Sequence, residues 1–109
     1  MGSALVGGII QSGLYRPDSV LVYDTYELAA ELMQDSIGVA IAESNAEIVA
    51  ESDVILLCVK PQGISDVLKE LTGSAGKLII SIAAGIKIET IETESDSGHR
   101  VIRVMPNTP

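Results

Sequence analysis

Two residues near the start of the chain, Gly2 and Asp24, are separated by a spacing that has a chemical meaning. Gly2 stands at the start of a segment that reads as a helix, and Asp24 follows the apolar run Val20 to Tyr23. In a dinucleotide-binding unit, the last glycine of a glycine-rich loop lets the first helix pack closely on the sheet, and an acidic residue about 20 positions later hydrogen-bonds a ribose hydroxyl. The pair therefore predicts a ribose-binding carboxylate at the carboxyl edge of a sheet. An ordinary turn or N-cap role for Asp24 is the alternative.

Two further strand candidates end in residues that are unsuited to continuing a strand. The run Val54 to Val59 leads into Lys60-Pro61, and the run Leu78 to Ile82 leads into Ala83-Ala84-Gly85. Ligands of open α/β sheets bind at such carboxyl ends. The proline can open a helix at its first position, and the small residues let a flat ligand approach the backbone. Ordinary turn chemistry is the alternative at both places.

Other residues with chemical potential are expected to be structural. Gly7 and Gly8 lie inside a predicted helix, so we assign them to close packing on a sheet, and Gly13 to the C-cap of that helix. His99 stands in a polar stretch before a strand and is expected at the surface. One acidic group has no His or Cys cluster beside it, so solvated side chains are expected there and no metal site: Glu89, Glu92, Glu94 and Asp96.

Apolar runs and helical patterns alternate along the chain, which is typical of βα units around a parallel sheet. The predicted strands are Val20 to Tyr23, Val54 to Val59, Leu78 to Ile82 and Val101 to Val104, with a weaker one at Val39 to Ile41. The predicted helices are Ser3 to Ser12, Glu27 to Met33, Asn45 to Glu51, Gln62 to Leu71 and Ile88 to Glu94. The helix that begins at Gln62 has the clearest apolar face, and Gly73 is expected to stop it. No linker divides the chain, so we expect a single α/β domain over residues 1–109.

Composition limits the classes of function. The 109 residues are 47% hydrophobic but only 3% aromatic, which suits a core of aliphatic side chains between a parallel sheet and helices. A net charge of -8 disfavours nucleic acid and anionic membranes as partners, whereas a dinucleotide can be held by backbone N–H groups. No apolar stretch reaches the roughly 18 residues of a membrane span, and no signal sequence is expected. The single cysteine, Cys58, lies in an apolar run, which predicts a buried free thiol and a reducing cytoplasm.

Four motifs in a fixed order make the prediction specific. They are Met1-Gly2-Ser3-Ala4-Leu5, Val59-Lys60-Pro61-Gln62, Ser81-Ile82-Ala83-Ala84-Gly85 and Arg103-Val104-Met105-Pro106-Asn107-Thr108-Pro109. In these motifs and their spacing, the whole chain resembles the pyrroline-5-carboxylate reductase family. The resemblance implies a Rossmann-like doubly wound parallel sheet and the NAD(P)H-dependent reduction of a small-molecule substrate. That reaction converts 1-pyrroline-5-carboxylate to L-proline by hydride transfer, the last step of proline biosynthesis.

The resemblance also assigns cofactor-binding positions. Cys58 to Pro61 and Ile82 to Ala84 fall where the family lines the cofactor, Asn45 falls where an asparagine contacts the adenosine half, and Met105 to Asn107 match a loop near the nicotinamide. The expected cofactor-binding residues are Met1, Gly2, Asp24, Asn45, Cys58, Val59, Lys60, Pro61, Ile82, Ala83, Ala84 and Asn107. Three of them have a simpler alternative: Cys58 as a core residue that contributes its backbone, Lys60 as a solvated cation, and Asn45 as a helix N-cap. No catalytic residue is assigned.

The sequence departs from the family pattern at both ends and at position 24. The first strand, the first two glycines and a C-terminal helical domain that forms the dimer and closes the substrate pocket are expected to be missing. We therefore expect an inactive, marginally stable chain with exposed strand edges, and a homo-oligomer only with that helical domain. Asp24 stands where many members have a small hydroxyl residue for the 2′-phosphate of NADP, which favours NADH. The alternative functions are a non-catalytic NAD(P)-binding or regulatory module and a fragment of another β-hydroxyacid-type dehydrogenase.

Overall fold

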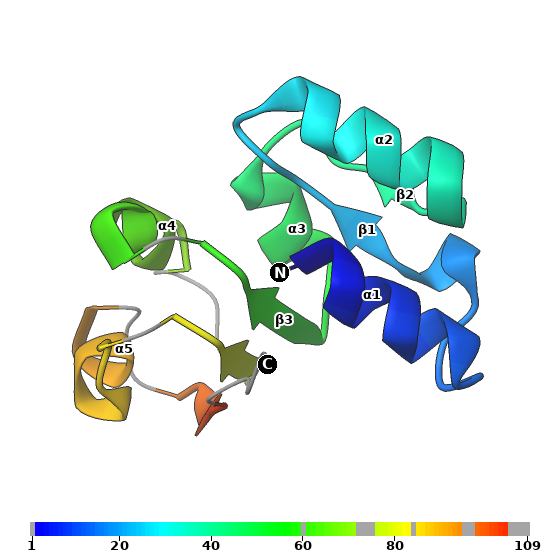
Figure 1. Cartoon of the computed structure of the whole chain (residues 1–109). Coiled ribbons are helices and arrows are strands. Elements are labelled where there is room, and N and C mark those ends of the chain that lie inside the picture. The colour runs from blue at the N-terminus through cyan, green and yellow to red at the C-terminus, as the bar shows by residue number, and fades with distance from the viewer. Residues whose placement is uncertain (1, 60, 72–75, 84, 95–97, 105–109) are drawn as a thin grey trace. The chain divides into compact units, whose positions relative to one another are not determined.

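The computed structural model describes residues 2–59, 61–71, 76–83, 85–94 and 98–104 (Figure 1). The chain forms two compact units, residues 1–48 and 49–109. Helices and parallel strands alternate in each of them, so the predicted α/β class is confirmed. None of the helices in the described ranges is long and apolar enough to cross a membrane.

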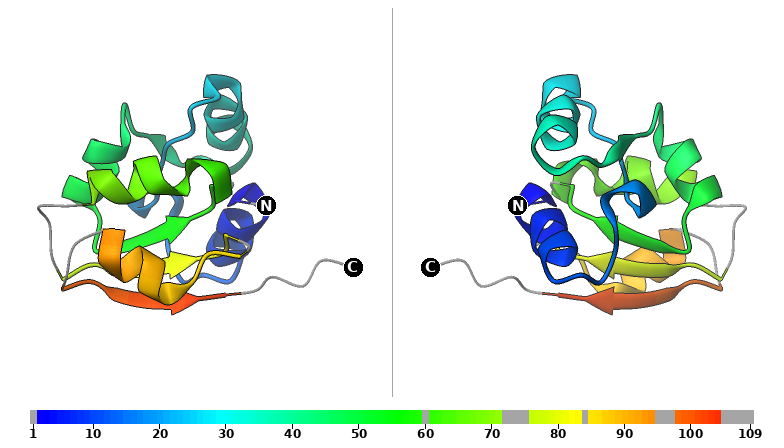
Figure 2. Two further views of the ribbon diagram at one scale, coloured as in Figure 1. Left: turned by 90° about the vertical axis from the view of Figure 1, so that its left-hand side faces the viewer. Right: turned by 90° about the vertical axis from the view of Figure 1, so that its right-hand side faces the viewer.

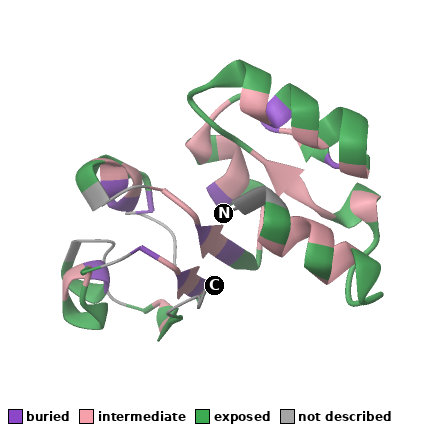
Figure 3. Ribbon diagram, viewed as in Figure 1, coloured by how far each residue is buried: buried purple, intermediate pink, exposed green. Residues whose placement is uncertain are grey.

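The first unit is built on a two-stranded parallel sheet. Its elements are α1 (Gly2–Gln11), the 3-10 helix η1 (Pro17–Ser19), β1 (Leu21–Val22), α2 (Glu27–Ile37) and β2 (Ala40–Ile41), and α3 (Asn45–Glu51) begins in it. The strands pair in parallel, with Leu21 beside Ala40 and Val22 beside Ile41. Its buried side chains are small or branched: Ala30, Val39 and Ala42 (Figure 3).

Two glycines in left-handed backbone conformations end the helices of this unit. Gly13 follows α1 with φ +81° and donates its N–H to the carbonyl of Ile10 at 3.1 Å, which confirms the predicted C-cap. Gly38 ends α2 with φ +85° and donates its N–H to the carbonyl of Gln34 at 2.9 Å. The helix therefore runs one turn beyond the predicted end at Met33, because it continues until a residue without a Cβ can adopt this conformation.

The predicted packing of the glycines inside α1 is wrong. A Cβ on Gly7 would meet Cδ1 of Ile37, at the end of α2, at an ordinary contact distance of 3.8 Å, and a Cβ on Gly8 would meet nothing within 4 Å. In the part of the chain that the structure describes, neither glycine is pressed against a strand.

The second unit is built on a three-stranded parallel sheet in the order β3-β4-β5. Its elements after α3 are β3 (Val54–Leu57), the 3-10 helix η2 (Pro61–Gly63), α4 (Ile64–Glu70), β4 (Leu78–Ser81), α5 (Ile88–Glu94) and β5 (Arg100–Arg103). The register places Leu57 beside Ser81 and Ser81 beside Arg103. Helices α4 and α5 lie on the same face of this sheet (Figures 1 and 2). The core between them consists of Ile55, Leu57, Ile64, Leu68, Leu71, Ile79, Ala83 and Ile91.

The helix predicted over Gln62 to Leu71 is split in the structure. Pro61 opens a short 3-10 helix, and the α-helix α4 begins only at Ile64. The predicted apolar face is confirmed, because Ile64, Leu68 and Leu71 are buried. Gly73, the predicted stop, lies outside the described residues.

The predicted single sheet is replaced by two parallel sheets among the described strands. β1 and β3 each have a neighbour on one side only in these sheets. The strands also end earlier than predicted, so that Cys58-Val59 and Ile82 lie beyond the sheet rather than in it.

Candidate functional site

The carboxyl ends of β3 and β4 bring two of the predicted cofactor-binding segments together. Because these strands are parallel and Leu57 lies beside Ser81, the residues that follow them leave the sheet at the same edge. The N–H of Ile82 donates to the carbonyl of Leu57 at 3.2 Å, which joins the two segments directly. Cys58, Val59 and Ile82 are half-buried there, and Ala83 is buried. Half-buried apolar groups beside backbone N–H and C=O groups are suited to one flat face of a ligand.

Cys58 at this edge is half-buried, so the prediction of a buried thiol is wrong in degree. The side chain follows the last residue of β3 and is therefore outside the packed sheet. Burial nevertheless raises the pKa of the Cys58 thiol. The neutral thiol is then the dominant form at pH 7, which makes Cys58 a poor nucleophile and agrees with a lining role.

Ser81 shapes this edge and was missed by the sequence prediction as a site residue. It is fully buried at the end of β4, and its Oγ accepts the N–H of Ala83 at 3.2 Å. This hydrogen bond fixes the turn that follows the strand. The signal that could have indicated it is one hydroxyl side chain in an otherwise aliphatic strand.

Replacing Ser81 by alanine is expected to lower the free energy of unfolding by about 1–3 kcal/mol, because the buried N–H of Ala83 loses its acceptor. Urea unfolding of the two proteins measures the difference. Ser36→Ala, at an exposed position of α2, is the matched control and should stay within about 0.5 kcal/mol of the parent. Equal stability of Ser81→Ala and the parent would show that the hydroxyl does not hold the turn.

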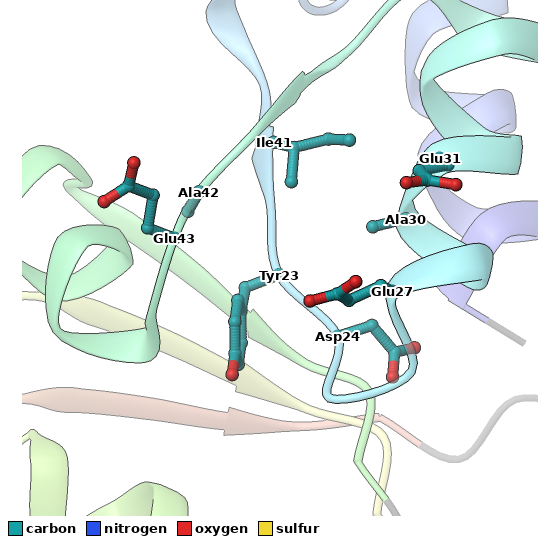
Figure 4. Close-up of a pocket in the computed structure, with 8 residues that line it drawn as sticks. All are labelled: Tyr23, Asp24, Glu27, Ala30, Glu31, Ile41, Ala42 and Glu43. Carbon is teal, nitrogen blue, oxygen red and sulfur yellow. The ribbon is translucent and has the colours of Figure 1, made fainter.

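A pocket of about 330 Å³ lies in the first unit at the carboxyl ends of β1 and β2 (Figure 4). Its apolar lining comes from Ala30, Ile41 and Ala42, and the ring of Tyr23 stands beside it. Four carboxylates complete the lining: Asp24, Glu27, Glu31 and Glu43. Sequence reasoning found only Asp24 among these eight residues, because the others are brought together by the packing of α2 against the strands.

The turn role of Asp24 is confirmed, and its predicted ribose-binding role stays a prediction. Its Oδ1 accepts the N–H of Tyr26 at 2.9 Å, which is the turn interaction of the alternative interpretation. The same exposed side chain lines the pocket. The turn role therefore leaves the exposed carboxylate in the lining of the pocket.

The N-cap of α3 is Ser44, so the alternative N-cap role of Asn45 is wrong. Ser44 Oγ accepts the N–H of Glu47 at 3.2 Å, and Glu47 Oε1 accepts the N–H of Glu43 at 3.0 Å. This reciprocal arrangement is close to a capping box. Asn45 is the first helical residue and is half-buried. Its predicted contact with the adenosine half of a dinucleotide stays a prediction.

The remaining predicted residues are only partly described. Gly2 begins α1 and Pro61 begins η2, as helix-opening positions. Met1, Lys60, Ala84 and Asn107 lie outside the described residues. The structure therefore brings together Cys58, Val59, Ile82 and Ala83 in one unit, and places Asp24 at a pocket in the other.

His99 was expected at the surface, and this expectation is wrong. The ring is half-buried: Nδ1 accepts the N–H of Lys77 at 3.3 Å, and Nε2 lies 3.4 Å from the carbonyl of Leu71. These two contacts connect the segment before β5 with the segments before β4. These are the amino ends of the strands, away from the edge described above. No group of three or more His, Cys, Asp or Glu side chains that could hold a metal is found in the described ranges.

Known proteins resemble the chain over its whole length. The family model described as NADP oxidoreductase, coenzyme F420-dependent, matches residues 1–85. A pyrroline-5-carboxylate reductase from Methanosarcina acetivorans is 44% identical over 109 residues, which cover 98% of this chain and 40% of that protein. The structure of a pyrroline-5-carboxylate reductase from Coxiella burnetii has a TM-score of 0.85 at 31% identity, over 98% of this chain and 40% of that one. The Plasmodium falciparum pyrroline carboxylate reductase with NADP bound gives 0.84 at 30% identity, over 100% of this chain and 39% of that one.

These comparisons confirm the predicted Rossmann-like fold class and the predicted resemblance. The chain spans about 40% of the length of the relatives that it matches.

Proposed function

We propose that residues 1–109 are the NAD(P)-binding region of a pyrroline-5-carboxylate reductase. The premise is that this chain belongs to the NADP oxidoreductase, coenzyme F420-dependent family and is related along its whole length to pyrroline-5-carboxylate reductases. The observation that carries the proposal is the continuous match to curated reductases, 44% identical over 109 residues. The whole enzyme would reduce 1-pyrroline-5-carboxylate to L-proline with NAD(P)H in proline biosynthesis. It would do so in the cytoplasm and as a homo-oligomer.

Each unit by itself offers features that suit part of a dinucleotide. The pocket beside Asp24 offers an aromatic ring and carboxylate acceptors, which suit an adenine ring and ribose hydroxyls. The edge formed by Cys58-Val59 and Ile82-Ala83 offers half-buried apolar surface next to backbone groups. Both lie at carboxyl ends of parallel strands, where open α/β sheets bind ligands.

The residues proposed to hold the cofactor have positioning roles. Asp24 would accept a ribose hydroxyl, and Asn45 would contact the adenosine half. Cys58, Val59, Ile82 and Ala83 would line the cofactor, with the remaining proposed contacts from Met1, Gly2, Lys60, Pro61, Ala84 and Asn107. When NAD(P)H is bound, its nicotinamide would supply the hydride for the imine carbon of the substrate. The chain's own residues would orient the cofactor and exclude water from it at the strand ends. None of them is proposed as an acid or base.

Dinucleotide binding by the 109-residue chain is the first test of this function. Titration of the ¹⁵N-labelled chain with NAD⁺ is expected to shift the amide signals of the residues that follow β1, β3 and β4. The amides of the opposite ends of the strands, around Lys77 and His99, are the internal control and should move little. A chain whose spectrum is unchanged by millimolar NAD⁺ and NADP⁺ would contradict the proposal.

A chimeric enzyme tests the reductase activity itself. In the Methanosarcina acetivorans relative, the segment matched by this chain is replaced by residues 1–109, and the residues of the relative on either side are kept. We expect NAD(P)H oxidation that depends on 1-pyrroline-5-carboxylate, with the isolated chain as the inactive control. A folded chimera that binds a cofactor and never turns over this substrate would favour another β-hydroxyacid-type dehydrogenase.

A further inference from the structure

Ser81 ends the central strand of the second unit. β4 lies between β3 and β5, and Ser81 is beside Leu57 on one side and Arg103 on the other. Among the described residues, Ser81 is the one buried polar side chain, and the other buried side chains are aliphatic. Burying a hydroxyl in an apolar core costs free energy unless the hydroxyl is hydrogen-bonded. The hydrogen bond that Ser81 makes must therefore offset this cost.

The ladder of hydrogen bonds between β3 and β4 ends at the residue after Ser81. Its last bond runs from the N–H of Ile82 to the carbonyl of Leu57 at 3.2 Å. In a parallel ladder the next bond would join the N–H of Val59 to the carbonyl of Ile82. Within the described ranges this bond is not formed, so the segments that follow β3 and β4 part here. We call the N–H of Val59 and the carbonyl of Ile82 the open ladder end.

The hydroxyl of Ser81 turns the chain out of the ladder on the β4 side. Continued pairing with β5 would direct the N–H of Ala83 to the carbonyl of Val104. Instead, Ser81 Oγ accepts this N–H at 3.2 Å. Ser81 itself stays in the sheet, because its carbonyl accepts the N–H of Val104 at 2.8 Å. The turn therefore begins directly after a residue that is fixed in the sheet.

We propose that Ser81 is a positioning residue for cofactor binding, whose buried hydroxyl preforms the open ladder end before a ligand arrives. This inference rests on the proposed function, which assigns Val59 and Ile82 to the lining of the cofactor. Ser81 is too deeply buried to touch a ligand, so it acts through the backbone of Ala83. A segment that is already ordered binds a ligand more tightly than one that the ligand must order, because the loss of entropy is not taken from the binding energy.

The dissociation constant of NAD⁺ tests this role. It is measured by amide-shift titration of the 109-residue chain and its variants, at a temperature at which each protein is folded. Ser81→Ala should weaken NAD⁺ binding by about five- to tenfold, since the ligand must then order the turn. Ser81→Thr keeps the hydroxyl that holds the N–H of Ala83, and its affinity should stay within about threefold of the parent.

The matched control separates positioning from a general loss of stability. Ile79→Val shortens a fully buried side chain on the same strand and the same face as Ser81. This substitution also destabilises the core, but it removes no hydrogen bond. Its affinity for NAD⁺ should stay within about twofold of the parent.

Hydrogen exchange of the parent chain gives a second measurement that needs no variant. Without a ligand, the amide of Ala83 should already be protected, and that of Val59 should exchange faster. If the parent binds NAD⁺ but Ser81→Ala binds it as well as Ile79→Val does, this inference is overturned while the proposed function stands. An unprotected Ala83 amide in a parent that binds NAD⁺ has the same meaning. If the parent binds neither NAD⁺ nor NADP⁺, both are overturned.

Discussion

Replacing Asp24 by asparagine in the chimeric reductase is expected to raise the ratio of kcat/KM with NADPH to kcat/KM with NADH by about tenfold. Two unit charges about 4 Å apart interact by about 4 kcal/mol at an effective dielectric near 20, and about a third of that energy corresponds to a tenfold ratio. We take only a third because Asp24 is exposed and solvent screens its charge. Asparagine keeps an oxygen acceptor for the N–H of Tyr26, so the turn before α2 should persist.

Two further variants accompany this measurement of cofactor preference. Asp24→Ser removes the carboxylate and places a small hydroxyl group there, and should move the ratio in the same direction. Asp35→Asn, at an exposed position of α2 outside the pocket, should leave the ratio within about twofold of the parent. A parent chimera that already prefers NADPH, or an Asp24→Asn chimera with an unaltered ratio, would contradict the role given to this carboxylate.

Replacing Leu68 by alanine is expected to have the largest effect on stability, a loss of about 2–5 kcal/mol in the free energy of unfolding. Leu68 is fully buried on α4, between Ile64 and Leu71 on the same face, and truncation leaves a cavity that its neighbours fill only in part. A loss of this size is a large share of the roughly 5–15 kcal/mol of a typical domain. The second unit should then unfold at a clearly lower urea concentration than in the parent.

Urea unfolding followed by circular dichroism measures this loss. The matched control is Leu28→Ala on α2, where the side chain is 48% exposed, and its effect should stay within about 1 kcal/mol. Equal losses for the two leucines would mean that α4 does not cover the core of the three-stranded sheet. In that case α4 would not stabilise the sheet whose strands β3 and β4 position Cys58, Val59, Ile82 and Ala83.

Local pattern was sufficient for most of the elements. The apolar face of α4 repeats every three to four residues, and β3, β4 and β5 are short aliphatic runs bounded by turn residues, so each carries its own signal. The capping pair Ser44 and Glu47 is also local, with the spacing of a capping box, and could have been found from the sequence. Gly38 is likewise a local signal, because a glycine at this position can end α2 in a left-handed conformation.

Tertiary structure decided the contacts between residues far apart in the sequence. His99 contacts Lys77 and Leu71, which lie 22 and 28 positions before it, so nothing in the polar stretch around it could indicate a half-buried ring. The distribution of the strands between two sheets depends on which backbone edges find partners, which is not a local property.

The candidate site divides in the same way. Gly2, Asp24 and the residues that follow β3 and β4 were predicted from the sequence, because strand ends and their spacing are visible in it. The carboxylates of Glu27, Glu31 and Glu43 became pocket residues only when α2 packed beside β1 and β2. The sequence specifies where a chain turns, because a turn depends on neighbouring residues. The charge around a pocket depends instead on which face of a helix packs against which strands, and this is decided by the tertiary structure.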